Sequence, residues 1–140
     1  MPTMTHPFTT SSSSAVAHRL LDAIVSRDAT ELYELFSADI WLRAMLVRET
    51  VEVHEAEAAA VLFDGWFGGA VELQVLHAST HSVGGREHLT YRLRLRPDWA
   101  PDTWHVIEQT GYARISDGRV RRLDLVCTGF APESEVTDEA

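Results

Sequence analysis

The chain has 140 residues, 45% of them hydrophobic and 24% charged, a composition that fits one globular domain and leaves no room for a second. Its formal net charge of -9 argues against non-specific binding to nucleic acid or an anionic membrane, because such binding needs clustered Lys and Arg. A single cysteine, Cys127, excludes an internal disulfide, and no apolar run approaches the length of a membrane span.

The two ends of the chain are predicted to be disordered tails. Residues 1–14 are rich in Thr, Ser and Pro, and residues 132–140 are polar and acidic, so neither segment buries enough apolar surface to offset its ordering entropy. Residues 15–131 then form one domain. The first residues lack the charged start and apolar core of a secretory signal, which predicts a cytoplasmic protein.

The first half of the domain has helical spacing. Asp28 stands three residues before Glu31, a capping-box-like pair that predicts a short second helix up to residue 36. A strand over residues 38–47 follows, and then a third helix over residues 55–69 that ends at Gly68 and Gly69. A longer first helix precedes them, because apolar residues recur there at three and four residue spacing: Val16, Ala17, Leu20, Leu21, Ile24 and Val25.

The second half of the domain alternates apolar and polar residues, as strands do. Four strands are predicted over residues 70–83, 86–97, 103–115 and 119–130, separated by turn and loop residues. Helices followed by an antiparallel run of strands predict an α+β domain with its helices packed on one face of a sheet.

Two stretches of this order resemble a known family. HRLLDAIVSRDATELYELFSADIWL resembles the opening of the nuclear transport factor 2-like superfamily, in its branch of SnoaL-like polyketide cyclases and ketosteroid isomerases, and ISDGRVRRLDLV resembles its closing hairpin. The resemblance covers residues 15–130. It implies a cone-shaped α+β barrel of cystatin-like arrangement, with a curved antiparallel sheet, an apolar pocket at one end and a homodimer through the outer sheet face.

The catalytic residues of that superfamily are not matched here. The resemblance places the base of the ketosteroid isomerases at Ala44, their tyrosine at Leu20 and their second acid near Gly111. It places the histidine and aspartate of the cyclases near Gly111 and at Asp124 or Leu125, and the alternation of the strand turns Asp124 outward. The acid and base set of the superfamily's epoxide hydrolases is not matched either.

Other polar residues on the predicted inner face are the candidate catalytic groups. His105 and Gln109 share the apolar face of one strand, whereas Glu108 points outward to a row of arginines. A histidine in an apolar pocket can remove a proton beside a carbonyl, and Gln109 can donate a hydrogen bond to the enolate oxygen. The alternative is a core-edge histidine and glutamine satisfied by backbone or water.

The candidate ligand-binding residues come from the same inner face and from the pocket rim. His77 is placed on the inward face of its strand together with His81, and Trp66 is placed at the pocket mouth. No histidine or cysteine spacing indicates a metal site, and no motif implies a cofactor. The full set of predicted ligand-binding residues is Tyr91, Trp66, His77, Leu123, Leu125 and Cys127.

Two classes of function remain. One is a small cofactor-independent enzyme, a cyclase, isomerase or dehydratase that acts by acid and base chemistry on a hydrophobic, carbonyl-bearing or polycyclic small molecule. The other is a non-catalytic module for hydrophobic ligands or for dimerisation. The inward histidines favour the enzyme, which we prefer, and the absence of every known catalytic set favours the module. The arginines of the outer face favour a solvated or interface surface over a phosphate site.

Overall fold

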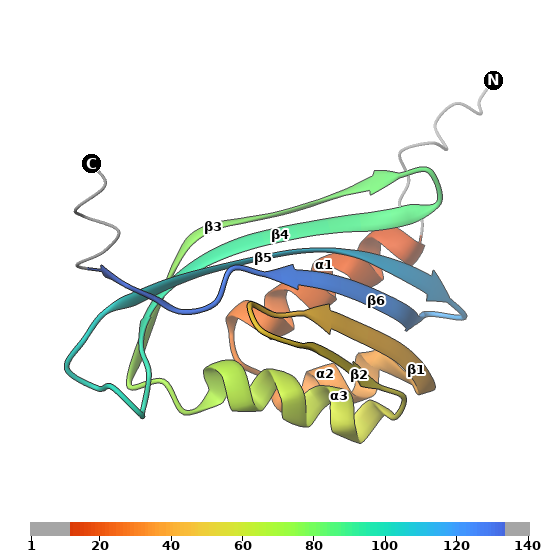
Figure 1. Cartoon of the computed structure of the whole chain (residues 1–140). Helices are drawn as coiled ribbons and strands as arrows, with labels where there is room; N and C mark the ends of the chain where they lie inside the picture. The colour runs from red at the N-terminus through yellow and green to blue at the C-terminus, as the bar shows by residue number, and fades with distance from the viewer. Residues whose placement is uncertain (1–11, 134–140) are drawn as a thin grey trace.

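The computed structural model describes residues 12–133, which form three helices and a curved sheet (Figure 1). The helices are α1 (Ser12–Val25), α2 (Ala29–Leu35) and α3 (Ala56–Phe63), and α3 continues into a short π-helical segment, η2 (Asp64–Gly68). The strands are β1 (Phe36–Met45), β2 (Thr50–Val53), β3 (Glu72–Val83), β4 (Arg86–Arg96), β5 (His105–Ser116), β6 (Arg119–Cys127) and β7 (Ala131–Pro132).

The strands form one mixed sheet in the order β2-β1-β6-β5-β4-β3, and β7 pairs with the start of β5. The run from β3 to β6 is antiparallel, as the sequence predicts, but β1 pairs with β6 in parallel. Figure 1 shows the long strands β3, β4 and β5 arching over the helices. The chain therefore has the predicted α+β cone, built on a sheet with one parallel pair.

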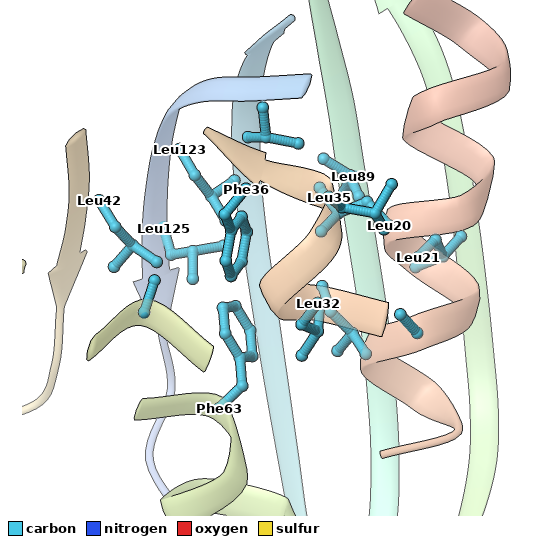
Figure 2. Packing of buried hydrophobic residues seen from close by; sticks show 14 of the residues in the cluster. Leu20, Leu21, Leu32, Leu35, Phe36, Leu42, Phe63, Leu89, Leu123 and Leu125 are labelled. Carbon is cyan, nitrogen blue, oxygen red and sulfur yellow. The ribbon is translucent and has the colours of Figure 1, made fainter. Parts of the chain in front are cut away.

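The core lies between the helices and the concave, inner face of the sheet. Phe36 at the start of β1 and Phe63 at the end of α3 lie with their ring centroids 6.2 Å apart (Figure 2). Around them pack leucines from α1 and α2 and from the inner positions of β1, β4 and β6. Apolar burial on this scale is the main stabilising contribution to the domain. No helix in residues 12–133 is both long enough and apolar enough to cross a bilayer.

The predicted cap of the second helix is confirmed. Asp28 is the N-cap residue of α2, and its carboxylate accepts a hydrogen bond of 3.0 Å from the backbone N–H of Glu31. This bond satisfies one of the donors that a helix leaves free in its first turn.

The boundaries of the domain differ slightly from the prediction. Helix α1 begins at Ser12, three residues before the predicted start, and Pro132 still belongs to β7. The predicted tails otherwise lie in residues 1–11 and 134–140, outside the described residues. Strands β2 and β7 were not predicted, since four and two residues are too few for alternation to be visible.

The predicted inward placement of His77 and His81 is wrong. Leu73 and Val75 face the inner positions Leu95 and Leu93 of β4, but the register then shifts by one residue. After this β-bulge at residue 76, His77 lies opposite the outward-facing Arg92. A one-residue insertion moves every later side chain to the other face of the sheet, so His77 and His81 are exposed on its outer face.

Candidate functional site

A buried polar pair lies in the middle of the inner face. Tyr91 of β4 and Gln109 of β5 are directly opposite each other in the antiparallel register. The Tyr91 hydroxyl donates a hydrogen bond of 2.5 Å to Oε1 of Gln109. Cys127 of β6 lies opposite Gln109 on the other side and is also buried. The predicted inward placement of all three residues is confirmed.

The amide of Gln109 has a donor with no partner. Its Nε2 atom is buried and makes no hydrogen bond. Burial raises the pKa of the Tyr91 phenol well above its usual value, and the thiol of Cys127 is a second, smaller cause. Tyr91 is therefore a neutral donor at physiological pH and holds the Gln109 oxygen, while the amide nitrogen remains without an acceptor. An unpaired donor inside a core lowers the free energy of unfolding, so a functional role would explain why the chain keeps one here.

His105 begins β5 and is buried as predicted. Its Nδ1 lies 3.0 Å from the backbone oxygen of Thr103, and because a carbonyl oxygen accepts, this hydrogen bond places a proton on Nδ1. Gln109 is four residues further along the strand, so the two Cα atoms are about 13 Å apart. The predicted catalytic pair thus shares a face but does not meet, and the structure brings Gln109 to Tyr91 instead.

Aromatic rings close this end of the cone. Trp99, in the loop between β4 and β5, lies with its ring 5.0 Å from the His105 ring and 5.7 Å from that of Phe130. Phe130, after β6, contacts Phe67, and Phe67 contacts Trp66 at the end of the third helix. We call Trp66, Phe67, Trp99 and Phe130 the aromatic cap. Trp66 is half-buried and Trp99 is 62% exposed.

The interior behind the aromatic cap is closed. Gln109 is 0% and Tyr91 is 1% exposed, so no space that a water molecule could enter borders these side chains. A void of about 10 Å³ lies between the helices, next to Leu32, Phe63 and Phe67, and has room for about one water molecule. A ligand can therefore reach Gln109 only if the side chains that surround it move.

The inner face of β6 completes the wall of the interior. Leu123, Leu125 and Cys127 are buried there, as predicted. His77 is not part of this wall. Among residues 12–133, no three His, Cys, Asp or Glu side chains are grouped so that they could hold a metal ion.

The positions at which the resemblance places catalytic residues are apolar in the structure. Ala44 and Leu20 are fully buried in the core. At Gly111 an added Cβ would lie 2.5 Å from the backbone oxygen of Asp124 and 2.6 Å from a methyl carbon of Leu125. Asp124 points outward, as predicted, and accepts a hydrogen bond of 2.9 Å from Arg122. The space for an acid or a histidine at residue 111 is thus filled by the next strand.

One buried acid was missed by the sequence analysis. Glu87 on the inner face of β4 is 5% exposed, and the hydroxyl of Ser82 lies 2.9 and 3.0 Å from its two carboxylate oxygens. Strand alternation does place residue 87 inward with Leu89 and Tyr91, so the signal was present in the register. The outward Glu108 pairs with Arg92 at 3.4 Å, which confirms the predicted cross-strand contact.

Comparison with known proteins finds similarity in structure alone. No protein-family model matches the sequence, and no curated protein matches it. Solved structures that match include a Δ5-3-ketosteroid isomerase from a Mycobacterium species, with a TM-score of 0.63 and 18% identity over 83% of this chain and 92% of that one. IdmH from Streptomyces antibioticus, a candidate polyketide cyclase, matches with a TM-score of 0.65 and 13% identity over 82% and 91%. An epoxide hydrolase from M. tuberculosis matches with a TM-score of 0.60 and 13% identity over 83% and 82%.

Proposed function

We propose, from the nuclear transport factor 2-like fold that this chain shares with those proteins, that its cone binds an apolar small molecule bearing a carbonyl oxygen. The matched structures carry names of different reactions, an isomerase, a cyclase and a hydrolase, so the fold by itself does not select one. The reaction class therefore depends on the residues that line the interior.

The observation that carries the proposal is the free amide donor of Gln109. Oε1 of Gln109 accepts the hydrogen bond from Tyr91, so the amide is held in one orientation, with Nε2 as a buried donor that has no partner. A carbonyl oxygen on an apolar ligand would satisfy this donor. An apolar wall with one fixed polar group is the usual composition of a small-molecule pocket.

The aromatic cap is the proposed entrance. Trp99 stands on a loop and is largely exposed, so turning its ring outward disrupts few buried contacts. A ligand that displaced it would exchange one set of aromatic contacts for another. The bound state would then have an open interior behind Trp99, with Gln109 at its base.

The test compares a ketone with a matched hydrocarbon. We expect 2-decalone to bind and to change Trp fluorescence, and Gln109→Leu to weaken this binding by about tenfold, the value of one hydrogen bond to a buried donor. Decalin, which has no carbonyl, should bind both proteins alike. Thr110→Val, at the next residue of β5 but on the outer face, is the control and should bind decalone as the wild type does. Equal decalone binding by Gln109→Leu and wild type would refute the role of the amide.

Acid and base catalysis on the same ligand is the second candidate function. The hydrogen bond from Nδ1 of His105 to the Thr103 oxygen favours it, because it fixes the orientation of the ring and leaves Nε2 as the nitrogen that can accept a proton. The separation of His105 and Gln109 calls for a conjugated polycyclic ligand, in which charge can spread from the deprotonated carbon to the oxygen. Such a reaction would be a cyclisation, isomerisation or dehydration.

His105→Gln tests the catalytic role. Turnover of a conjugated polycyclic ketone should be lost while fluorescence still reports binding of that ketone, and thermal unfolding should show a folded protein. Retained turnover would exclude His105 as the base. The homodimer through the outer face and the cytoplasmic location stay predictions.

A further inference from the structure

The outer face of the sheet gathers arginines on a chain whose net charge is negative. Seven of the twelve basic residues point outward from its strands: Arg43, Arg86, Arg92, Arg94, Arg96, Arg114 and Arg122. Four of them form ion pairs with carboxylates, those of Glu108, Glu133, Glu72 and Asp124. Within residues 12–133, Arg43, Arg86 and Arg114 make no ion pair and no side-chain hydrogen bond.

Two of the unpaired arginines lie in one hollow. A surface hollow of about 570 Å³ is lined by Arg86, Tyr112, Arg114, Arg122 and Asp124, which come from β4, β5 and β6. We call it the arginine hollow. Three guanidinium groups face one carboxylate there, and that carboxylate is already bonded to Arg122 at 2.9 and 3.5 Å. Two positive charges therefore have no counter-charge from the protein.

The arrangement works against stability. Arg114 and Arg122 are directly opposite each other in the register of β5 and β6. Like charges at directly opposed positions of a sheet repel each other and destabilise the pair of strands. An anion bound between them would remove that repulsion, and guanidinium groups are suited to the task because they hold carboxylate and phosphate oxygens through paired N–H donors.

An apolar surface adjoins the charged one. A second hollow, of about 230 Å³, shares Tyr112 and Asp124 with the arginine hollow, extends over Met45 and Val126, and is also lined by Arg43. Tyr112, Met45 and Val126 are 43%, 49% and 57% exposed, so large apolar side chains face solvent directly beside the unpaired arginines. The site thus combines guanidinium groups that can bind an anion at one end with exposed apolar side chains at the other.

We propose that the arginine hollow binds a carboxylate or phosphate group of a soluble small molecule whose apolar part covers Met45 and Val126. This site lies on the opposite face of the sheet from Gln109 and does not depend on the function proposed for the interior. The net charge of -9 opposes adsorption to an anionic membrane, so the ligand is a soluble anion and not a lipid surface.

The experiment uses octyl phosphate, with octanol as its uncharged analogue, and measures binding by calorimetry and by amide chemical shifts. Octyl phosphate should bind the wild type, perturb residues 86, 112, 114 and 122, and weaken as salt is raised. Replacing both free arginines, in Arg86→Gln/Arg114→Gln, should reduce its affinity by about tenfold or more, as expected for hydrogen bonds to a charged group. The matched control is Arg92→Gln, which removes the same charge from the same face outside the hollow and should bind as the wild type does.

Three results would overturn the proposal. One is unchanged binding of octyl phosphate by Arg86→Gln/Arg114→Gln, and another is an equal loss in Arg92→Gln, which would reveal general attraction to a basic surface. The third is a dimer in sedimentation that octyl phosphate leaves intact and Arg114→Glu dissociates, because the hollow would then belong to a second copy of the chain. Gln109→Leu should leave octyl phosphate binding unchanged. Arg114→Gln should unfold at the same temperature as the wild type or higher, since it removes a like-charge contact.

Discussion

The inner and outer faces of the sheet are built from the same strands, but an unpaired polar group is buried on the inner face and hydrated on the outer face. On the inner face a donor without a partner, Nε2 of Gln109, is cut off from water and is therefore costly. On the outer face Arg86 and Arg114 also have no partner, yet they remain hydrated, and the cost at Arg114 comes from the like charge of Arg122 directly opposite. An unpaired group thus indicates a candidate ligand site for a different reason on each face. On the inner face the reason is the cost of desolvation, and on the outer face it is the repulsion between like charges.

The two proposed sites also differ in their accessibility to a ligand. Gln109 and Tyr91 are buried in the interior, so side chains have to move before a ligand can enter it, and the aromatic cap is the proposed entrance. The arginine hollow is open in the structure as it stands. Binding to the interior should therefore be slowed by the opening of the cap, whereas binding to the outer face should need no rearrangement.

The largest difference between the faces is expected for adjacent residues of β6. Leu125 is 2% exposed on the inner face and Val126 is 57% exposed on the outer face. Leu125→Ala should lower the free energy of unfolding by about 2–5 kcal/mol, through lost burial and the cavity left behind. Val126→Ala should change it by about 0.5 kcal/mol or less. Chemical denaturation measures both, and a large, concentration-dependent loss in Val126→Ala would mean that a second molecule covers the outer face.

Two neighbouring polar pairs on β4 and β5 allow a smaller and sharper test. Tyr91 and Gln109 form the inner pair, and Thr90 and Thr110, 3.3 Å apart, form the outer pair at the next position of the same register. Tyr91→Phe alone should cost about 1–3 kcal/mol, because the amide of Gln109 loses its remaining partner.

The double variant Tyr91→Phe/Gln109→Leu should recover this loss. With both polar groups removed, the free energy of unfolding should equal that of the wild type or exceed it by about 1 kcal/mol, and decalone binding should still be weakened. Thr90→Val/Thr110→Val serves as the matched control and should show little coupling between its two substitutions. A double variant no more stable than Tyr91→Phe alone would argue that the unpaired amide carries no cost.

The smallest effect is expected at the edge of the outer face, where the chain after β7 is held. Arg94 donates hydrogen bonds of 2.6 and 2.9 Å to Glu133 and lies 3.8 Å above the Trp104 ring. The hydrogen bond from Arg94 lowers the pKa of Glu133 below its ordinary value of 4.5. A lowered carboxyl pKa contributes stability that is present above the ordinary value and is lost as the pH falls through the native value.

Glu133→Gln should accordingly be slightly less stable than the wild type at pH 7. The two proteins should converge as the pH falls below the native pKa of Glu133, because the wild-type carboxyl is then neutral too. Thermal unfolding across this range measures the difference, and a gap that persists unchanged in acid would show that the charge of Glu133 contributes nothing. Glu108→Gln, which removes the exposed partner of Arg92 at 3.4 Å, provides a comparison with a longer ion pair.

Much of the fold follows from local patterns that the sequence displays directly. Helical spacing from Val16 to Val25 and alternation in β4, β5 and β6 are repeated often enough to be read without a structure. These patterns correctly turn Tyr91, His105 and Gln109 inward and Glu108 and Asp124 outward. The cap at Asp28 is also local, since it depends on two residues three positions apart.

The wrong prediction for His77 shows a feature that the alternation within one strand does not predict. The bulge at residue 76 inserts one residue into β3 against β4, and no Gly or Pro marks it in the sequence. Two apolar residues in a row, Val75 and Leu76, interrupt the alternation at this point, but they do not by themselves say which of the later residues face inward. A bulge is decided by the fit between two strands, so the sequence of one strand does not reveal it.

By itself the sequence determined the α+β class, the order of the main elements and the face on which most side chains of the last three long strands lie, because these depend on periodicity within single elements. Only the tertiary structure decided which polar groups meet. It joined Tyr91 to Gln109, kept His105 about 13 Å away along the strand, closed the cone with aromatic residues from three separate segments, and set Arg114 opposite Arg122. Those relations depend on strand register and loop position, which are properties of pairs of elements that no single stretch of sequence contains.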